Sequence, residues 1–256
     1  MRQTEWTILP SSHIKTIRQL RERKFRESTG CFWAEGERTI STLLEKKLSM
    51  EFAVLSKSQQ DRNWLFPPSS ILFSCRENDT KKIKATETFS GIGAVFHKPT
   101  FTPLEGNTLI ALDEIQDPGN LGTLFRTALW FGFPHFLLDR KSADPFNEKT
   151  VRASMGAIAG IHAHVENELL ETLKFLKNKG YTLIGTDLQG DSSFSFPAGK
   201  KILVFGNEAH GISKEILELC DHTMRISGNG GVESLNVTVA AGIVMHALSN
   251  DLVKVF

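Results

Sequence analysis

The chain has 256 residues, 40% of them hydrophobic, so it can bury a substantial core. The formal net charge is only +1, but residues 1–100 hold 17 Lys/Arg against 11 Asp/Glu, whereas residues 101–256 hold 13 against 18. No apolar run reaches the roughly 18 residues of a membrane span, and no apolar signal core opens the chain, so we expect a cytoplasmic protein. The basic first half favours a module that docks on RNA or DNA, although many basic surfaces only confer solubility.

The three cysteines, Cys31, Cys75 and Cys220, are far apart and form no CxxC pair. This spacing argues against a disulfide framework and against a zinc site, and it favours reduced thiols. We therefore expect no bound metal.

The first half predicts a small α/β domain. A helix is expected after Ser11 or Ser12, because Ile14, Ile17, Leu20 and Phe25 fall near one face while basic residues crowd the rest. A second helix is predicted at 36–48, and the apolar runs 52–56, 71–75 and 92–97 predict strands. Two prolines and a glycine at 97–107 then mark a boundary, which gives domains 1–100 and 101–256.

The second half alternates strands with helices, which predicts a mostly parallel, doubly wound α/β sheet. Ligands of such sheets bind beyond the carboxyl ends of the strands. The expected strands are 109–113, 136–139, 181–187, 201–206 and 222–227, and the expected helices are 118–132, 166–180, 213–220 and 234–250.

Three stretches that follow strands are too polar and too rich in glycine for ordinary connections. In the first, 112–128, Asn120 and Arg126 are about two helical turns apart and point broadly the same way, unless Asn120 only caps the helix. In the second, 203–213, Gly206 permits close approach of a ligand, and Glu208 suits a neutral or cationic one such as an adenosine or a sulfonium. Neither a dinucleotide fingerprint nor a phosphate-binding loop is present.

The third stretch, 226–248, leads through flexible glycines to Ser234, a plausible helix cap, and then to a helix that is apolar nearly all round. Such a helix is buried, either in the core or between two subunits.

The three stretches, in this order, resemble the three motifs of the SpoU (TrmH-type) family of RNA 2′-O-ribose methyltransferases, in the SPOUT superfamily. "NLGTLFRTA" (120–128) resembles the first motif, "FGNEAHGIS" (205–213) the second and "SLNVTVAAGI" (234–243) the third. "VRASMGAIAG" (151–160) is similar to the family's sequence between the first two motifs. The basic segment 18–40 is similar to the small ribosomal-protein-like RNA-binding domain that many members carry.

The resemblance covers nearly the whole chain, and it implies several properties. The C-terminal sheet would carry a deep trefoil knot that binds S-adenosylmethionine, largely through backbone groups, and members act as homodimers. By motif position, Gly206, Ile226 and Leu235 would line the cofactor pocket. One departure is visible: members commonly have Ile-Pro-Met where this chain has Ile226-Ser227-Gly228.

Family positions also imply the catalytic residues, which are Asn120, Arg126, Glu208, Ser234 and Asn236. Arginine stays protonated in proteins, so Arg126 is expected to hold the phosphate beside the acceptor ribose and to lower the pKa of its hydroxyl, rather than to act as a general base. Glu208 would orient Arg126 or take the proton. The methyl donor is already activated, so the reaction requires no metal.

Positions 15–26 contain six Lys/Arg and one Glu, which makes this segment the candidate for phosphate contacts. The predicted RNA-binding residues are Arg18, Arg21, Arg23, Lys24 and Arg26. The two-domain layout favours ribosomal RNA as the substrate. The alternatives are the same reaction on transfer RNA, a non-catalytic RNA-binding protein with this fold, or another nucleotide-binding enzyme such as a dehydrogenase.

Overall fold

The computed structural model describes residues 6–84, 89–101, 104 and 106–253. The chain forms two compact units. The first unit consists of Met1–Thr100 together with Asp144–Ala159, and the second unit of Phe101–Ala143 and Gly160–Phe256. The break after Thr100 lies at the boundary expected from the prolines. Asp144–Ala159 differs from expectation, because it packs with the first unit although it lies within the C-terminal half of the sequence.

The first unit is built on a five-stranded mixed sheet in the order β1-β4-β3-β5-β2. The strands are β1 (Thr7–Ile8), β2 (Cys31–Glu35), β3 (Met50–Ser56), β4 (Leu72–Cys75) and β5 (Ile92–His97). β3 is parallel to β4, whereas β5 is antiparallel to both β2 and β3. The three strands expected here are confirmed. The sequence analysis missed β2, every residue of which is buried.

The second unit contains a six-stranded sheet in the order β11-β9-β10-β6-β7-β8, and every neighbouring pair is parallel. This confirms the predicted parallel α/β sheet. The strands are β6 (Thr108–Leu112), β7 (His135–Asp139), β8 (His162–Glu166), β9 (Thr182–Asp191), β10 (Lys201–Phe205) and β11 (His222–Met224). All residues of the central β6 and β10 are buried, which explains why these two strands are uninterrupted apolar runs.

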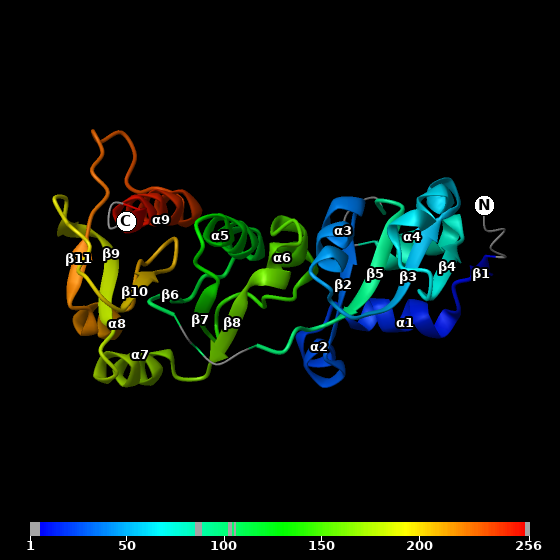
Figure 1. Cartoon of the computed structure of the whole chain (residues 1–256), viewed down its shortest axis with the longest axis horizontal. Helices are drawn as coiled ribbons and strands as arrows, with labels where there is room; N and C mark the ends of the chain where they lie inside the picture. Colours follow the sequence, from blue (N-terminus) through cyan, green and yellow to red (C-terminus); the bar gives the residue numbers. More distant parts are fainter. Residues whose placement is uncertain (1–5, 85–88, 102–103, 105, 254–256) are drawn as a thin grey trace. The chain divides into compact units, whose positions relative to one another are not determined.

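Helices cover this sheet. α7 (Leu169–Asn178) and α8 (Lys214–Leu219) bury Leu169, Leu173 and Ile216 in one apolar cluster with residues of β6, β9 and β10. α5 (Pro118–Trp130) and α9 (Val237–Val253) pack against each other on the other side of the sheet (Figure 1). The trefoil knot implied by the family resemblance stays a prediction. Within the described residues, no helix has the length and hydropathy needed to cross a membrane.

The helix expected after Ser11 is two helices, α1 (Ser11–Gln19) and α2 (Arg23–Thr29). Ile14 and Ile17 are buried, as their spacing predicted. α2 ends at Gly30, which adopts a left-handed φ of 66°. The other helices described in the first unit are α3 (Glu37–Glu45), α4 (Glu77–Ile83), the 3-10 helix η1 (Lys57–Leu65) and, from the later segment, α6 (Glu148–Ala153). A second 3-10 helix, η2 (Ala157–Gly160), begins at the end of that segment.

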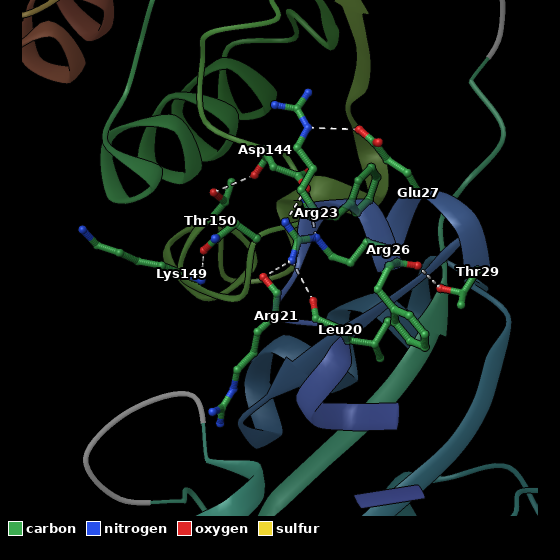
Figure 2. Close-up of polar contacts among 12 residues, drawn as sticks. Leu20, Arg21, Arg23, Arg26, Glu27, Thr29, Asp144, Lys149 and Thr150 are labelled. Atoms are coloured by element: carbon green, nitrogen blue, oxygen red, sulfur yellow. Dashed lines mark hydrogen bonds and ion pairs between the residues drawn. The ribbon is translucent and has the colours of Figure 1, made fainter. Parts of the chain in front are cut away.

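A buried ion pair joins the two sequence segments of the first unit. Arg26 is only 2% exposed, and its Nε donates to Asp144 Oδ2 at 2.9 Å, with a second contact from Nη2. Its Nη1 donates to the backbone oxygens of Leu20 and Arg21, both at 2.7 Å (Figure 2). These oxygens lie in the turn between α1 and α2, so a single side chain holds the turn and the distant segment together.

Replacing Asp144 by alanine should destabilise the first unit by about 3–5 kcal/mol, because Arg26 would be left as a buried charge without its counter-ion. Urea denaturation followed by tryptophan fluorescence measures this, since Trp6, Trp33 and Trp64 belong to the first unit. The matched control is Glu27→Ala, which removes the exposed partner of Arg23 and should cost less than about 1 kcal/mol. Equal effects of the two substitutions would contradict the assigned role of Asp144.

Candidate active site

A cavity of about 500 Å³ lies in the second unit, where β10 and β11 end. Its walls come from 186–188 in β9, from 205–211 at and after the end of β10, and from 224–226 at and after the end of β11. The segment before α9 adds 233–235, and α9 itself adds Val237 and Ala240. This is the carboxyl edge of a parallel sheet, where ligands of such folds bind. The volume is that of a pocket for a small organic ligand or cofactor.

The loop after β10 is folded tightly on itself. Asn207 and Gly211 exchange two backbone hydrogen bonds of 2.9 Å, and the Asn207 side-chain oxygen accepts from the Ala209 amide at 2.8 Å. A methyl group on Gly206 would lie 2.2 Å from both Gly211 C and Ile212 N. Only glycine therefore fits at position 206, and backbone groups form this wall of the cavity.

Two acidic residues before α5 have structural roles, although the sequence analysis did not single them out. Asp113 is 5% exposed, and its Oδ2 accepts from the Ser213 amide at 2.7 Å, at the start of α8. Asp117 is the N-cap of α5 and accepts from the Asn120 amide at 2.9 Å. Because Asp117 caps the helix, the side chain of Asn120 is available for other contacts.

Three of the predicted catalytic residues meet beside the cavity. Asn120 Nδ2 donates to Glu208 Oε1 at 2.6 Å, and Asn236 Nδ2 donates to Asn120 Oδ1 at 3.4 Å. These residues lie 88 and 116 positions apart in the sequence, one from each of the three motif-like stretches. The fold thus joins the three stretches through one chain of side-chain hydrogen bonds.

The start of α9 differs from expectation. Asn236, rather than Ser234, caps this helix: its Oδ1 accepts from the Thr238 amide at 2.8 Å and from the Thr238 hydroxyl at 2.6 Å. Ser234 is exposed and lines the cavity together with Glu208. Its side chain therefore faces a ligand site rather than the helix end.

The three residues predicted to contact the cofactor, Gly206, Ile226 and Leu235, all line this cavity. Their contact with a cofactor stays a prediction. The cavity also has two acidic wall residues, Asp187 and Glu233, that the sequence analysis did not single out. Asp187 follows the apolar part of β9, so the rule that ligands bind at carboxyl ends of strands was the signal that could have identified it.

Arg126 lies apart from this hydrogen-bonded chain. It is exposed on α5, and no hydrogen bond or ion pair joins it to any residue that the structure describes. In particular, Glu208 is bound by Asn120 rather than by Arg126.

The comparison with known proteins identifies the family. The sequence pattern of the SpoU rRNA methylase family matches residues 107–246, and that of the MRM3-like substrate binding domain matches residues 11–94. The chain belongs to the SpoU rRNA methylase family. Membership makes it an S-adenosylmethionine-dependent RNA methyltransferase, as the motifs predicted.

Relatives in the SpoU family align with both units of this chain. The 23S rRNA (guanosine(2553)-2′-O)-methyltransferase RlmP of Bacillus subtilis is 31% identical over 92% of this chain and 95% of its own length. A putative TrmH-family RNA methyltransferase from Porphyromonas gingivalis has a TM-score of 0.83 at 33% identity, over 94% of this chain and 98% of that one. An rRNA methyltransferase from Sinorhizobium meliloti, solved with bound AdoMet, has a TM-score of 0.81 at 27% identity, over 96% and 97% of the two chains.

One predicted RNA contact of this SpoU chain is wrong. Arg26 is buried and bound to Asp144, so its guanidinium is not accessible to the phosphates of an RNA. Arg23 donates to Glu27 at 3.0 Å, and Arg21 donates to the backbone oxygen of Lys84 at 2.5 Å (Figure 2 shows Arg21 and Arg23 beside the buried Arg26). Arg18 and Lys24 are exposed, so they are the best placed of the five for contact with a nucleic acid.

Replacing Gly206 by alanine should weaken S-adenosylmethionine binding by roughly 5- to 150-fold, the equivalent of about 1–3 kcal/mol of overpacking, because the added methyl meets backbone rather than a mobile side chain. Isothermal titration calorimetry measures the affinity. Gly228→Ala is the matched control, since a methyl at that position has no heavy atom within 4 Å. Unchanged binding by the Gly206 variant would show that this loop is not part of the cofactor site.

Proposed function

We propose that this protein transfers the methyl group of S-adenosylmethionine to the 2′-hydroxyl of a ribose in ribosomal RNA. The observation that carries the proposal is the position of the hydrogen-bonded side chains Asn120, Glu208 and Asn236 at a glycine-walled cavity on the carboxyl edge of the sheet. Methyl transfer requires the methyl donor and the acceptor hydroxyl to be aligned, and polar groups held in place beside a pocket for a small ligand can align them.

Ribosomal RNA is favoured over transfer RNA by the relative that acts on it. RlmP aligns over 92% of this chain, and its name gives 23S rRNA as its substrate. The alignment therefore includes the unit that matches a substrate binding domain, not only the catalytic one. Because RNA is selected mainly by shape and by unpaired bases, similarity across that unit supports a similar class of substrate.

The cavity suits S-adenosylmethionine. Its glycine wall presents backbone groups without side chains between them and the ligand, and Asp187 and Glu233 provide negative charge for the sulfonium or the amino group. When bound, S-adenosylmethionine supplies an activated methyl group. The protein's task is then to place the acceptor hydroxyl in line with that group and to assist loss of its proton.

Within the site, Asn120 fixes the Glu208 carboxylate, and Asn236 fixes Asn120 in turn. This contact leaves Glu208 Oε2 to accept a hydrogen bond from the acceptor hydroxyl or to take its proton. Arg126, which is exposed on α5, is available to bind the phosphate beside the acceptor ribose, and its charge lowers the pKa of the neighbouring hydroxyl.

We further propose a homodimer formed through the second unit. Val239 and Ile243, one helical turn apart on α9, are 49% and 44% exposed, and Trp130 at the end of α5 is 84% exposed. α5 and α9 pack against each other, so both helices contribute apolar surface on the same side of the sheet. Apolar side chains exposed on adjacent helices support a contact with a second copy.

The deciding experiment is transfer of radiolabelled methyl from S-adenosylmethionine to total RNA that lacks this modification, with the product nucleoside identified by mass spectrometry. We expect a 2′-O-methylnucleoside in the ribosomal fraction. The same product in the transfer RNA fraction would show that the substrate is transfer RNA instead. Cofactor binding without transfer to any RNA would argue against the proposed substrate, and absence of cofactor binding would favour a non-catalytic RNA-binding protein.

Replacing Arg126 by alanine should lower kcat for methyl transfer by about 100- to 1,000-fold, the usual cost of losing one electrostatic stabiliser. S-adenosylmethionine binding should stay nearly intact, because Arg126 is not among the residues that line the cavity. Single-turnover kinetics and calorimetry measure the two quantities separately. Arg126→Lys, which keeps the charge but loses bidentate geometry, should be intermediate. An equal loss of binding and transfer would contradict the assigned role.

Reversing the charge of Arg18 and Lys24 together, by Arg18→Glu and Lys24→Glu, should weaken RNA binding and lower the slope of log affinity against log salt by about 1 for each lost phosphate contact. Filter binding over a range of salt concentrations measures the slope. The control reverses Lys174 and Lys214, exposed lysines of the second unit that pair with Glu171 and Glu218. A slope unchanged from that of the native protein would show that α1 and α2 do not contact the RNA.

A further inference from the structure

Three side chains with metal-binding groups meet at one end of three neighbouring strands in the first unit's sheet, where β2 and β3 begin and β5 ends. Cys31 at the start of β2 has its Sγ 3.4 Å from His97 Nδ1, at the end of β5, and 3.6 Å from Glu51 Oε2 of β3. The three ligand atoms lie within 4.8 Å of one another. Among the described residues, no other three His, Cys, Asp or Glu side chains form such a group.

The strand register explains why these residues converge. Cys31 and His97 are directly opposite each other in the antiparallel pair of β2 and β5, so their side chains lie on the same face. Glu51 would point to the face opposite that of its neighbour Phe52 if β3 were regular. The register of β3 against β5 shifts between Met50 and Phe52, and this bulge turns the Glu51 carboxylate toward Cys31.

The spacing agrees with tetrahedral coordination of zinc. With zinc bonds of about 2.3 Å to sulfur and about 2.0–2.1 Å to nitrogen or oxygen, neighbouring ligand atoms of a tetrahedron are about 3.5 Å apart. Both contacts of the Cys31 sulfur have nearly this length. Thiolate, imidazole and carboxylate are also a ligand set that zinc accepts, and the two anionic ligands neutralise the charge of a divalent ion.

The environment supports a bound ion rather than a reactive cysteine. Cys31 is 5% exposed, so its sulfur is shielded from solvent and faces the other two ligand atoms. Glu51 and His97 are exposed, which gives an ion a path from solvent and leaves room for water as the fourth ligand.

We propose that Cys31, Glu51 and His97 bind one zinc ion that ties together the strands β2, β3 and β5 of the substrate-binding unit. The site is structural. It lies in the first unit, whereas the cofactor cavity lies in the second, and transfer of a methyl group from a sulfonium does not need a Lewis acid. The proposal therefore does not depend on the methyltransferase activity.

The test uses Co²⁺ as the probe, added to the reduced full-length chain after treatment with a chelator. A cysteine thiolate bound to Co²⁺ gives a near-ultraviolet charge-transfer band, which carboxylate or imidazole ligands do not give. We expect one equivalent of Co²⁺ to produce this band and Zn²⁺ to abolish it by displacement.

Cys31→Ser should remove the band, and Cys220→Ser, which changes a cysteine of the other unit, should keep it. Because Cys31 is buried and its substitution can disturb the fold, the exposed ligands provide the second pair of variants. Glu51→Gln and His97→Ala should each weaken Co²⁺ binding by at least the roughly 10-fold that loss of a supporting partner costs. Far-ultraviolet circular dichroism confirms that these variants are folded.

Added Zn²⁺ should also raise the Tm of the native chain but not that of His97→Ala. Three results would overturn the proposal: no charge-transfer band in the native chain, a band that persists in Cys31→Ser, or Co²⁺ affinity unchanged in both Glu51→Gln and His97→Ala. In each case the three side chains would form only a hydrogen-bonded cluster.

Discussion

The catalytic half of this protein depends on the close approach of two backbone segments at the carboxyl edge of its sheet. Gly206 leaves the end of β10 directly against Gly211 and Ile212, with no space for even a methyl group. This contact folds the loop back on itself, so that Asn207 bridges it and Glu208 is directed toward Asn120. The pocket wall and the position of the carboxylate therefore follow from one backbone constraint.

Much of the second unit could be predicted from the sequence, because buried parallel strands are continuous apolar runs and their ligand-binding residues follow them directly. β6 and β10 are examples, and Glu208 was found through its position just after β10. β8 was harder to predict, since it lies at the edge of the sheet and its polar sequence HAHVE has little apolar character. Asp113 could not be recognised, because the amide that it binds belongs to Ser213, 100 positions away. Asp117 could have been recognised as a helix cap, because Pro118 follows it directly.

The first unit shows a different limit of sequence reasoning. β3, β4 and β5 were visible as apolar runs, whereas β1 and β2 were not predicted. The partners of its polar residues come from distant positions. Arg26 stands in a basic segment that resembles an RNA-binding surface, and only the ion pair with Asp144 shows that it is a core residue. Glu51 likewise gives no signal of its own, because a bulge rather than strand alternation sets its direction. Cysteine spacing could not suggest a metal site here, since the other two ligands come from separate strands.

The discontinuity of the first unit also affects how the chain folds during its synthesis. Arg26 leaves the ribosome 118 residues before Asp144 does. At the usual 5–20 residues per second, that interval is about 6–24 s. Throughout it, a guanidinium destined for the interior has no counter-ion, and the turn between α1 and α2 lacks its anchor to the later segment. The substrate-binding unit is therefore completed only after β6, α5 and β7 of the catalytic unit have been made, so its folding cannot finish before synthesis of the catalytic unit has begun.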